Sequence, residues 1–363
     1  MTTAPEEPKP ALRRRVTLRH LAEHLGLSTA TVSLAMRNKP RVSEETRQRV
    51  LKGMRELGYV YNRGAASLRS EITGAVGVAI NDITDPYFAQ LLIAIQSELH
   101  SKGRMVFLCH STESPKLQDD FIEALREYSA DGLIVCPATG TETASLRRLL
   151  DWRLPAVMVT RSVPDTDLSF VGSDDERGME LATEHLIGLG HARIAFLGGS
   201  TAISTGRDRL AGYAKALERH SIAVDRSLVV PCPTNRRGGI AAISQALGLS
   251  DRPTAAVCFA DIVAFGVMLE LSRRGIRPGP DFSVVGYDDV IEAALWNPPL
   301  TTISVQRHAM GIAAAQLLTE LIEAQSLSPR RVIFEPSLTI RASSGVLRSG
   351  STPQAAIARA VRF

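Results

Sequence analysis

The sequence predicts an α/β protein in which a small N-terminal helix-turn-helix unit precedes a large core of two lobes with parallel sheets. The first 70 residues hold 14 Lys and Arg against 6 Asp and Glu, whereas the rest of the chain is mildly acidic. From residue 74 onward, apolar strand-like runs alternate with amphipathic stretches, in two series placed in tandem. Strands that are each followed by a helix predict parallel sheets covered on both faces, and two series predict two lobes with a cleft between them.

Composition excludes several classes of protein. With 363 residues, 44% hydrophobic and 22% charged, the chain is neither disordered nor too small for a sizeable core. No apolar run approaches the roughly 18 residues of a membrane helix, and no apolar stretch follows the Arg run of residues 13–15. We therefore expect a cytoplasmic, nucleoid-associated protein without a membrane partner. The four cysteines are widely spaced and predict small buried side chains in a reducing compartment, at Cys109, Cys136, Cys232 and Cys258.

Residues 17–58 predict three short helices. Thr17, Ser28 and Ser43 are suitable N-caps, and Gly26 and Gly58 suit the left-handed turns that end helices. Two helices of about two turns joined by a tight turn with Gly are typical of a helix-turn-helix. Apolar residues recur at the spacing of a shared core, at Leu18, Leu21, Leu25, Leu27, Val32 and Ala35.

The second helix, from Thr29 to about Arg37, has the composition of a DNA-reading element. Its residues Thr29, Ala30, Ser33 and Leu34 are expected to face away from this core. Its exposed N-terminal end is short and not acidic, so it can approach base edges in a major groove. Basic residues near it are candidate phosphate contacts, which set affinity and register without reading sequence. These are Arg37, Lys39, Arg41, Arg47 and Arg49.

A competing motif lies on the first helix. His20-Leu-Ala-Glu23-His24 has the H-x-x-E-H pattern of inverted zinc peptidases. However, no catalytic domain is built around this helix, no third ligand is indicated, and short motifs often match by chance. We expect these residues to form the polar face of the helix, with no metal and no cofactor.

The run VTLRHLAEHLGLSTATVSLAMRN, followed by RVSEETRQRVLKGMRELGYVYNRGAASLRS, resembles the headpiece of the lactose/galactose-repressor (LacI/GalR) family. The resemblance covers essentially the whole chain and implies a periplasmic-binding-protein-like core whose chain crosses between lobes three times. By position, Thr29, Ala30 and Leu34 fall where the family reads operator bases. None is a strong bidentate reader, so apolar contacts and DNA shape are expected to contribute. The remaining DNA-binding candidates are Thr17, Ser28, Thr31, Ser33, Asn38, Leu68 and Arg69.

The resemblance also implies a hinge segment that becomes a short helix on DNA. Leu68 occupies the position of the family's leucine, which is wedged into a minor-groove base step. Packing of Leu68 against the headpiece is the alternative, and Tyr61 departs from the Pro that many members carry. The predicted organisation is a disordered arm at 1–15, the headpiece at 16–60, the hinge at 61–73, the core at 74–345 and a flexible tail at 346–363. The tail lacks the leucine heptads of a coiled coil, so a homodimer through the core is expected.

The cleft of the core offers ligand-binding candidates but no catalytic motif. There is no G-x-G-x-x-G after the first strand, no P-loop and no G-x-S-x-G, so an enzyme is not predicted. By position, Arg209 in STGRDRLAGY and Asp288 in VVGYDD match the family's best-defined effector contacts. An Asp and an Arg can bond neighbouring sugar hydroxyls while an aromatic face covers the ring. The other candidates are Asp82, Tyr87, Phe88, Arg161, Asp261 and Trp296.

Some of these candidates have purely structural alternatives. Asp261 could only cap a helix, Trp296 could pack between domains, and Arg207 could pair at the surface.

The sequence thus predicts a repressor that binds a near-palindromic double-stranded DNA operator as a homodimer. A small molecule, a sugar or sugar derivative, binds the cleft and changes the lobe angle. Two alternatives remain open: a stand-alone sugar-binding protein with an unrelated basic N-terminus, and a regulator of the same family that responds to a purine or another non-sugar ligand. A sugar-processing enzyme has no catalytic constellation to support it.

Overall fold

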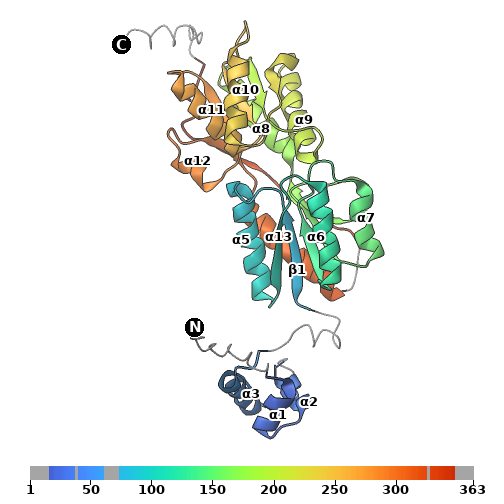
Figure 1. Cartoon of the computed structure of the whole chain (residues 1–363). Coiled ribbons are helices and arrows are strands. Elements are labelled where there is room, and N and C mark those ends of the chain that lie inside the picture. Colours follow the sequence, from blue (N-terminus) through green and yellow to red (C-terminus); the bar gives the residue numbers. More distant parts are fainter. Residues whose placement is uncertain (1–15, 37–39, 61–72, 325–327, 348–363) are drawn as a thin grey trace, which may run out of the picture. The chain divides into compact units, whose positions relative to one another are not determined.

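The computed structural model describes residues 16–36, 40–60, 73–324 and 328–347 (Figure 1). The chain divides into two compact units, Met1–Thr73 and Gly74–Phe363. Within the described ranges, no helix combines the length and the apolar character needed to cross a membrane. Predictions made for residues 1–15, Arg37, Asn38, Lys39, Tyr61, Leu68, Arg69 and the tail from residue 348 lie outside the described residues.

The first unit contains the three predicted helices. They are α1 (Leu18–Leu25), α2 (Thr29–Met36) and α3 (Glu44–Leu57). The predicted caps are confirmed, because the hydroxyls of Thr17, Ser28 and Ser43 accept bonds from backbone amides of the following helices. Gly26 and Gly58 end α1 and α3 with positive φ values of 63° and 65°. A small core is formed by Leu21, Ala22, Val32, Ala35, Val42 and Val50.

Lobe 1 of the second unit is a six-stranded sheet in the order β11-β5-β4-β3-β1-β2. Along β1, Val76, Val78 and Ile80 pack toward α5 and α13, whereas Ala75 and Ala79 pack toward α6 and α7. This alternation arises because successive strand residues point to opposite faces. The elements are β1 (Ala75–Ile80), α5 (Pro86–Ser101), β2 (Met105–His110), α6 (Pro115–Glu127), β3 (Gly132–Val135), α7 (Thr143–Asp151), β4 (Ala156–Val159), β5 (Ser169–Ser173), α13 (Arg307–Ala324) and β11 (Arg331–Phe334).

Lobe 2 is a second six-stranded sheet, in the order β12-β10-β9-β8-β6-β7. Helices α8 and α9 pack together, as do α10 and α11, and the two pairs cover the sheet (Figure 1). The short α12 was not predicted. The elements are α8 (Asp175–Gly188), β6 (Ile194–Leu197), α9 (Ser204–Arg219), a 3-10 turn (Arg226–Leu228), β7 (Val229–Val230), α10 (Arg236–Leu247), β8 (Ala255–Cys258), α11 (Asp261–Arg273), β9 (Ser283–Asp288), α12 (Ile291–Leu295), β10 (Thr301–Ser304) and β12 (Ser337–Thr339).

The chain crosses between the lobes three times. The crossings follow β5, β10 and β11, so that α13 and β11 return to lobe 1 and β12 ends in lobe 2. Every strand pair is parallel except β10 with β12. The predicted α/β architecture with two lobes and parallel sheets is therefore confirmed.

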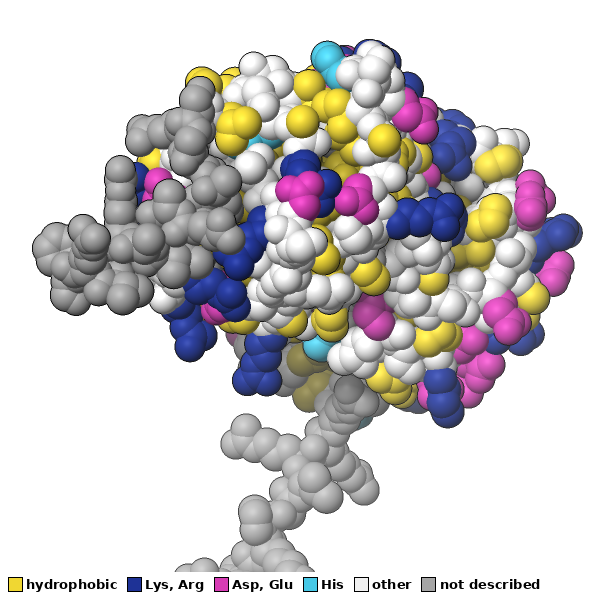
Figure 2. All heavy atoms as spheres, turned by 90° about the horizontal axis from the view of Figure 1, so that it is seen from above, with side chains coloured by type: hydrophobic (Ala, Val, Ile, Leu, Met, Phe, Trp, Pro, Cys, Tyr) yellow, Lys and Arg dark blue, Asp and Glu magenta, His cyan; other side chains and the backbone are white. Residues whose placement is uncertain are grey.

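All four cysteines are free thiols, and their burial differs from the prediction in part. Cys136 and Cys258 are buried, but Cys109 and Cys232 are only partly buried. Cys232 follows the last residue of β7 by two positions and reaches the space between the lobes. Seen from above, the visible surface of the molecule mixes apolar side chains with charged ones of both signs (Figure 2).

Candidate ligand-binding cleft and nucleic-acid interface

A cavity of about 460 Å³ lies between the two lobes. Residues that follow the carboxyl ends of strands in both sheets line it, which is where open α/β folds bind ligands. Lobe 1 contributes Asn81, Asp82, Asp85, Phe88, His110, Thr112, Glu113, Thr139 and Arg161, and lobe 2 contributes Ser200, Ile203, Cys232, Pro233, Thr234 and Asn235. Three predicted effector contacts, Asp82, Phe88 and Arg161, are among these lining residues.

Arg161 and Glu113 form a bidentate ion pair in the cleft. The two terminal nitrogens of Arg161 lie 2.9 Å from the two carboxylate oxygens of Glu113. The backbone amide and hydroxyl of Thr139 also donate to Glu113. Burial opposes ionisation of Glu113, but these bonds outweigh it and lower its pKa to about 2. Glu113 was not predicted; its only sequence signal is its position shortly after β2.

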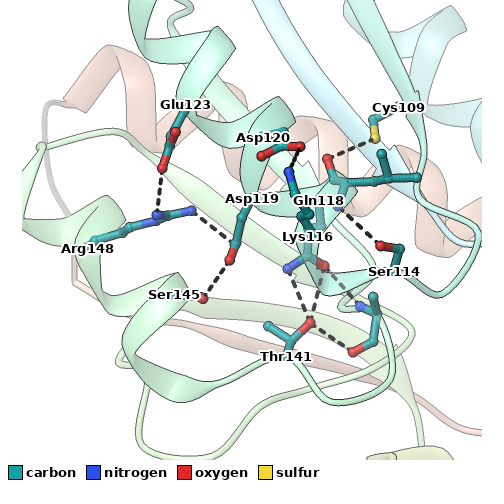
Figure 3. A network of polar contacts seen from close by, with 12 residues as sticks. Cys109, Ser114, Lys116, Gln118, Asp119, Asp120, Glu123, Thr141, Ser145 and Arg148 are labelled. Atoms are coloured by element: carbon teal, nitrogen blue, oxygen red, sulfur yellow. Dashed lines mark hydrogen bonds and ion pairs between the residues drawn. The ribbon is translucent and has the colours of Figure 1, made fainter.

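A polar network in lobe 1 fixes the loop that supplies Thr139 (Figure 3). The buried Gln118 of α6 accepts a bond from the Ala138 amide at 2.9 Å and lies 3.2 Å from the Thr141 hydroxyl. Asp119 bonds Ser145 and pairs with Arg148, which joins α7 to α6. The cleft wall at this loop is therefore supported by two helices behind it.

Acceptor groups dominate the lobe 1 side of the cleft. The Asp82 carboxylate lies 3.7 Å from His110. Asp85 caps α5 by accepting a bond from the Tyr87 amide, and burial raises its pKa to about 6. The Asn81 side-chain amide donates to the Pro137 carbonyl, but its buried oxygen has no hydrogen-bond partner among the described residues. A ligand with hydroxyl donors would satisfy such groups.

Arg209 and Asp288 lie together in a buried cluster of lobe 2. The Arg209 guanidinium lies 2.8 Å from Asp175 and 3.8 Å from Asp288. It also donates to the Phe259 carbonyl and stacks 3.6 Å from the centre of the Tyr287 ring. Burial raises the pKa of Asp288, and the guanidinium opposes that rise. Neither Arg209 nor Asp288 lines the cavity directly.

Three other candidates have contacts that hold the walls of the cleft together. The Tyr87 hydroxyl lies 2.8 Å from the Thr160 hydroxyl. Asp261 is fully buried and accepts bonds from Thr302 at 2.6 Å and from the Val290 amide at 2.9 Å. Trp296 stacks on Phe265 with ring centres 4.4 Å apart. None of the three lines the cavity, and the exposed Arg207 donates to the nearby Thr201 carbonyl.

Direct bonds link the two lobes beside the cleft. The Ser204 hydroxyl of lobe 2 accepts a bond from the Ser162 amide of lobe 1 at 3.0 Å. Arg307, at the start of α13, donates to the carbonyls of Asp288 at 2.8 Å and Asp289 at 2.5 Å, and also contacts Gln90 of α5. Arg307 thus joins a lobe 1 helix to the end of β9 in lobe 2.

In the headpiece, the N-terminal end of α2 is exposed. Thr29 and Ala30 are exposed, whereas Thr31 and Ser33 are partly buried. Leu34 was expected to face away from the core, but it is partly buried against it. Leu34 lies about 100° around the helix from the buried Ala35, so its side chain reaches the flank of the core.

Two of the predicted phosphate contacts are engaged within the headpiece. Arg47 pairs with Glu44 at 2.7 Å, and Arg49 donates to the Leu25 carbonyl at 3.1 Å, whereas Arg41 is exposed.

The H-x-x-E-H residues of α1 are bound to other partners. His20 accepts a bond from the Thr17 amide and completes the cap of α1. Glu23 pairs with Arg19 at 2.8 Å, and His24 lies 3.6 Å from Glu56. Within the described ranges, no group of three His, Cys, Asp or Glu side chains could hold a metal ion.

A helix-turn-helix unit joined to a two-lobed core with a cleft defines the class of ligand-responsive DNA-binding proteins. The model of the family described as bacterial regulatory proteins, lacI family, matches residues 17–62. The model described as periplasmic binding proteins and sugar binding domain of LacI family matches residues 73–342. The chain therefore belongs to the LacI family and is a DNA-binding transcriptional regulator.

Several relatives are similar over nearly their whole length. The transcriptional regulator GalR of Escherichia coli is 32% identical, over 90% of this chain and 95% of the relative. The transcriptional repressor PurR of Mannheimia succiniciproducens is 31% identical, over 90% of this chain and 98% of the relative. The Lac repressor dimer bound to operator and the anti-inducer ONPF superimposes with a TM-score of 0.81 at 29% identity, over 92% of this chain and 100% of that chain.

Two solved structures with a bound sugar are also similar. The complex of the regulator CelR with cellobiose has a TM-score of 0.69 at 27% identity, over 91% of this chain and 100% of that chain. A LacI family regulator from Enterococcus faecium with bound ribose has a TM-score of 0.69 at 26% identity, over 76% of this chain and 100% of that chain.

Proposed function

We propose that this regulator is a homodimeric repressor whose affinity for a near-palindromic operator is changed by a sugar bound in the cleft. The observation that supports this most is that both lobes line one cavity. A ligand that touches both lobes has different contacts when the lobe angle changes, and only such a ligand can shift the equilibrium between the two arrangements.

The cleft residues support a sugar as the ligand class. Asp82 and the buried oxygen of Asn81 are acceptors for hydroxyl groups, and Phe88 offers an aromatic surface for the apolar face of a sugar ring. Arg161, Arg209 and Asp288 are proposed as further contacts or as groups that orient them. We assign Tyr87, Asp261 and Trp296 to the support of the cleft walls, on the strength of their internal contacts.

DNA recognition is assigned to the headpiece and the hinge. The exposed Thr29 and Ala30 at the start of α2 are proposed to contact base edges, with Leu34 beside them. The first turns of α1 and α2 offer backbone amides to phosphates near Thr17 and Ser28. Thr31, Ser33, Asn38, Leu68 and Arg69 remain candidates by position, with Leu68 as the minor-groove wedge.

The homodimer is proposed to form through the core, at the edge of lobe 1. The edge strand β2 exposes Met105, Phe107 and Leu108, and the Phe107 ring lies 6.4 Å from that of Tyr128. Ile93 of α5 is 63% exposed. An exposed apolar edge strand tends to pair with another chain or to be covered by one, so we propose that a second copy of this chain binds this surface.

Two linked experiments test the proposed function. DNA selected from a randomised pool by the full chain should be a near-palindrome, bound as one dimer. A thermal-shift screen of sugars, nucleobases and amino acids should then find a sugar that raises the melting temperature and changes the affinity for that DNA. A hit restricted to nucleobases would contradict the sugar assignment, and selected DNA without symmetry would contradict the dimeric operator.

A further inference from the structure

We propose that the cleft selects uncharged ligands, so that its effector is a sugar without a phosphate or carboxylate group. This inference rests on the proposed function, in which a small molecule occupies the cavity between the lobes. The proposed function names a sugar, whereas this inference also distinguishes a sugar from its phosphate, which has hydroxyl groups too but carries a negative charge.

The charges that line the cavity are predominantly acidic. Asp82, Asp85 and Glu113 contribute three carboxyl groups, against the single guanidinium of Arg161. His110 also lines the cavity and lies against the Asp82 carboxylate. A phosphate placed here would face several carboxyl groups, and bringing like charges together is unfavourable.

The buried guanidinium groups are already paired. Arg161 directs both terminal nitrogens at Glu113, and one of them also donates to the Pro137 carbonyl at 3.3 Å. Arg209 is held by Asp175, with Asp288 at 3.8 Å. An anionic ligand that took either guanidinium would leave a buried carboxylate without its partner, which is strongly unfavourable.

The hydrogen-bonding groups of the cavity also favour a ligand with donors. The Asn81 oxygen is buried and has no hydrogen-bond partner among the described residues, and the carboxylates of Asp82 and Glu113 only accept. Hydroxyl groups both donate and accept, whereas an ionised phosphate or carboxylate offers acceptors alone. A sugar hydroxyl can therefore satisfy an acceptor that a phosphate or carboxylate group in the same place would leave unpaired.

The feature of the cleft that most favours an anion is the N-terminus of α10, which begins at Arg236. Its amides are partly satisfied, because the Asn235 side chain accepts a bond from the Gly238 amide at 2.9 Å. The positive charge of Arg236 interacts with the Asp85 carboxylate and partly offsets the rise that burial causes in the pKa of that carboxyl group. One amide at this end is thus occupied by the chain's own Asn235 side chain and is not available to a phosphate.

The inference is tested with matched ligand pairs on the full chain. Glucose with glucose 6-phosphate, galactose with galactose 1-phosphate, and ribose with ribose 5-phosphate are compared by calorimetry at one pH and ionic strength. For any sugar that binds, we expect its phosphate to bind at least about 30-fold more weakly, equivalent to about 2 kcal/mol. A phosphate that binds as tightly as its parent sugar would overturn the inference.

Inorganic phosphate provides a second arm that does not depend on the identity of the sugar. Its effect on the melting temperature is compared with that of chloride for the wild type, Arg161→Gln and, as a headpiece control, Arg41→Gln. We expect phosphate to change the melting temperatures of the wild type and Arg161→Gln by the same amount, because the Arg161 guanidinium is already paired with Glu113. If phosphate raised the melting temperature of the wild type and of Arg41→Gln but not that of Arg161→Gln, the inference would be overturned. If no sugar binds, the sugar assignment of the proposed function fails, while this arm still decides whether the cleft accepts an anion.

Discussion

At the scale of single residues, the cleft is defined by carboxyl groups whose environments differ. Glu113 is ionised by its pair with Arg161, which holds its pKa near 2, whereas burial raises the pKa of Asp85 to about 6. Asp82 is 41% exposed and lies beside His110. The three neighbouring acids therefore differ: Glu113 is the partner of a buried arginine, Asp85 caps a helix, and the partly exposed Asp82 accepts bonds from the Thr84 amide and hydroxyl.

Asp85→Asn is predicted to stabilise the chain at neutral pH. The carboxyl has a pKa of about 6 in the folded chain against a reference value of 3.8, so the folded state binds the proton more tightly. Native stability therefore falls as pH rises from about 4 to about 6, and the loss persists above that range. Asparagine keeps the cap on the Tyr87 amide without the charge. We expect a gain of about 1–3 kcal/mol at pH 7.5 that vanishes below pH 4.

Denaturant unfolding at several pH values measures this effect, and Asp82→Asn is the matched control. Asp82 is the more exposed acid on the same loop, so its substitution should change stability little. Equal stability of Asp85→Asn and the wild type at pH 7.5 would show that burial of this carboxyl has no cost.

At the scale of helices and strands, the α8–α9 pair depends on a close backbone approach. A methyl group added at Gly212 of α9 would overlap the carbonyl of Glu176 in α8, and backbone cannot move aside as a side chain can. We predict that Gly212→Ala destabilises the core by about 1–3 kcal/mol, through separation of the two helices. Thermal and denaturant unfolding measure it.

Gly188, near the end of α8, is the control for that substitution. An added methyl group there meets nothing within 4 Å, so Gly188→Ala should be neutral or stabilising by up to about 1 kcal/mol. Similar losses in both variants would mean that helix packing at Gly212 is not the cause.

Arg307 is predicted to hold the turn after β9 in place. Its guanidinium bonds the Asp288 and Asp289 carbonyls and contacts Gln90, and a single lysine nitrogen cannot reproduce this geometry. Asp288 and Asp289 have positive φ values of 114° and 54°, so the turn needs support. Arg307→Lys should speed hydrogen exchange at residues 288–290 by about tenfold or more. Unchanged exchange there, with His308→Ala as the neighbouring control, would remove this role.

The helix ends and the order of strands and helices could be predicted from the sequence, because the residues that determine them lie close together in the chain. Thr17, Ser43, Gly26 and Gly58 mark helix ends through bonds within a few residues, and alternating strand and helix patterns indicated both sheets. Glu113 and Asn81 were not predicted, because their importance comes from Arg161 and Pro137, which are distant in the chain. The support role of Asp261 likewise depends on Thr302, 41 residues away.

At the scale of the whole molecule, DNA recognition is assigned to the first unit and ligand binding to the second, and the regulator is proposed to act as a homodimer. Phe107→Glu is predicted to yield a monomer, because it places a charge on the apolar edge of β2, where Phe107 is 43% exposed. Sedimentation analysis measures the oligomeric state. Ile340→Glu, at another exposed apolar position, should remain dimeric. If Phe107→Glu remained dimeric and bound DNA with unchanged affinity, the dimer interface would not lie at β2.

We propose that occupancy of the cleft controls affinity for DNA. The most direct measurement is the dissociation constant for the selected near-palindromic DNA, with and without the uncharged sugar, by fluorescence anisotropy. For the wild type and for the exposed control Arg207→Lys, we predict a change of about tenfold or more on adding the sugar. Arg209→Lys, which cannot keep both the Asp175 pair and the Phe259 bond, should bind DNA normally but lose most of that response. An equal response in Arg209→Lys would show that Arg209 does not transmit ligand binding, and no response in the wild type would show that the cleft does not control affinity for DNA.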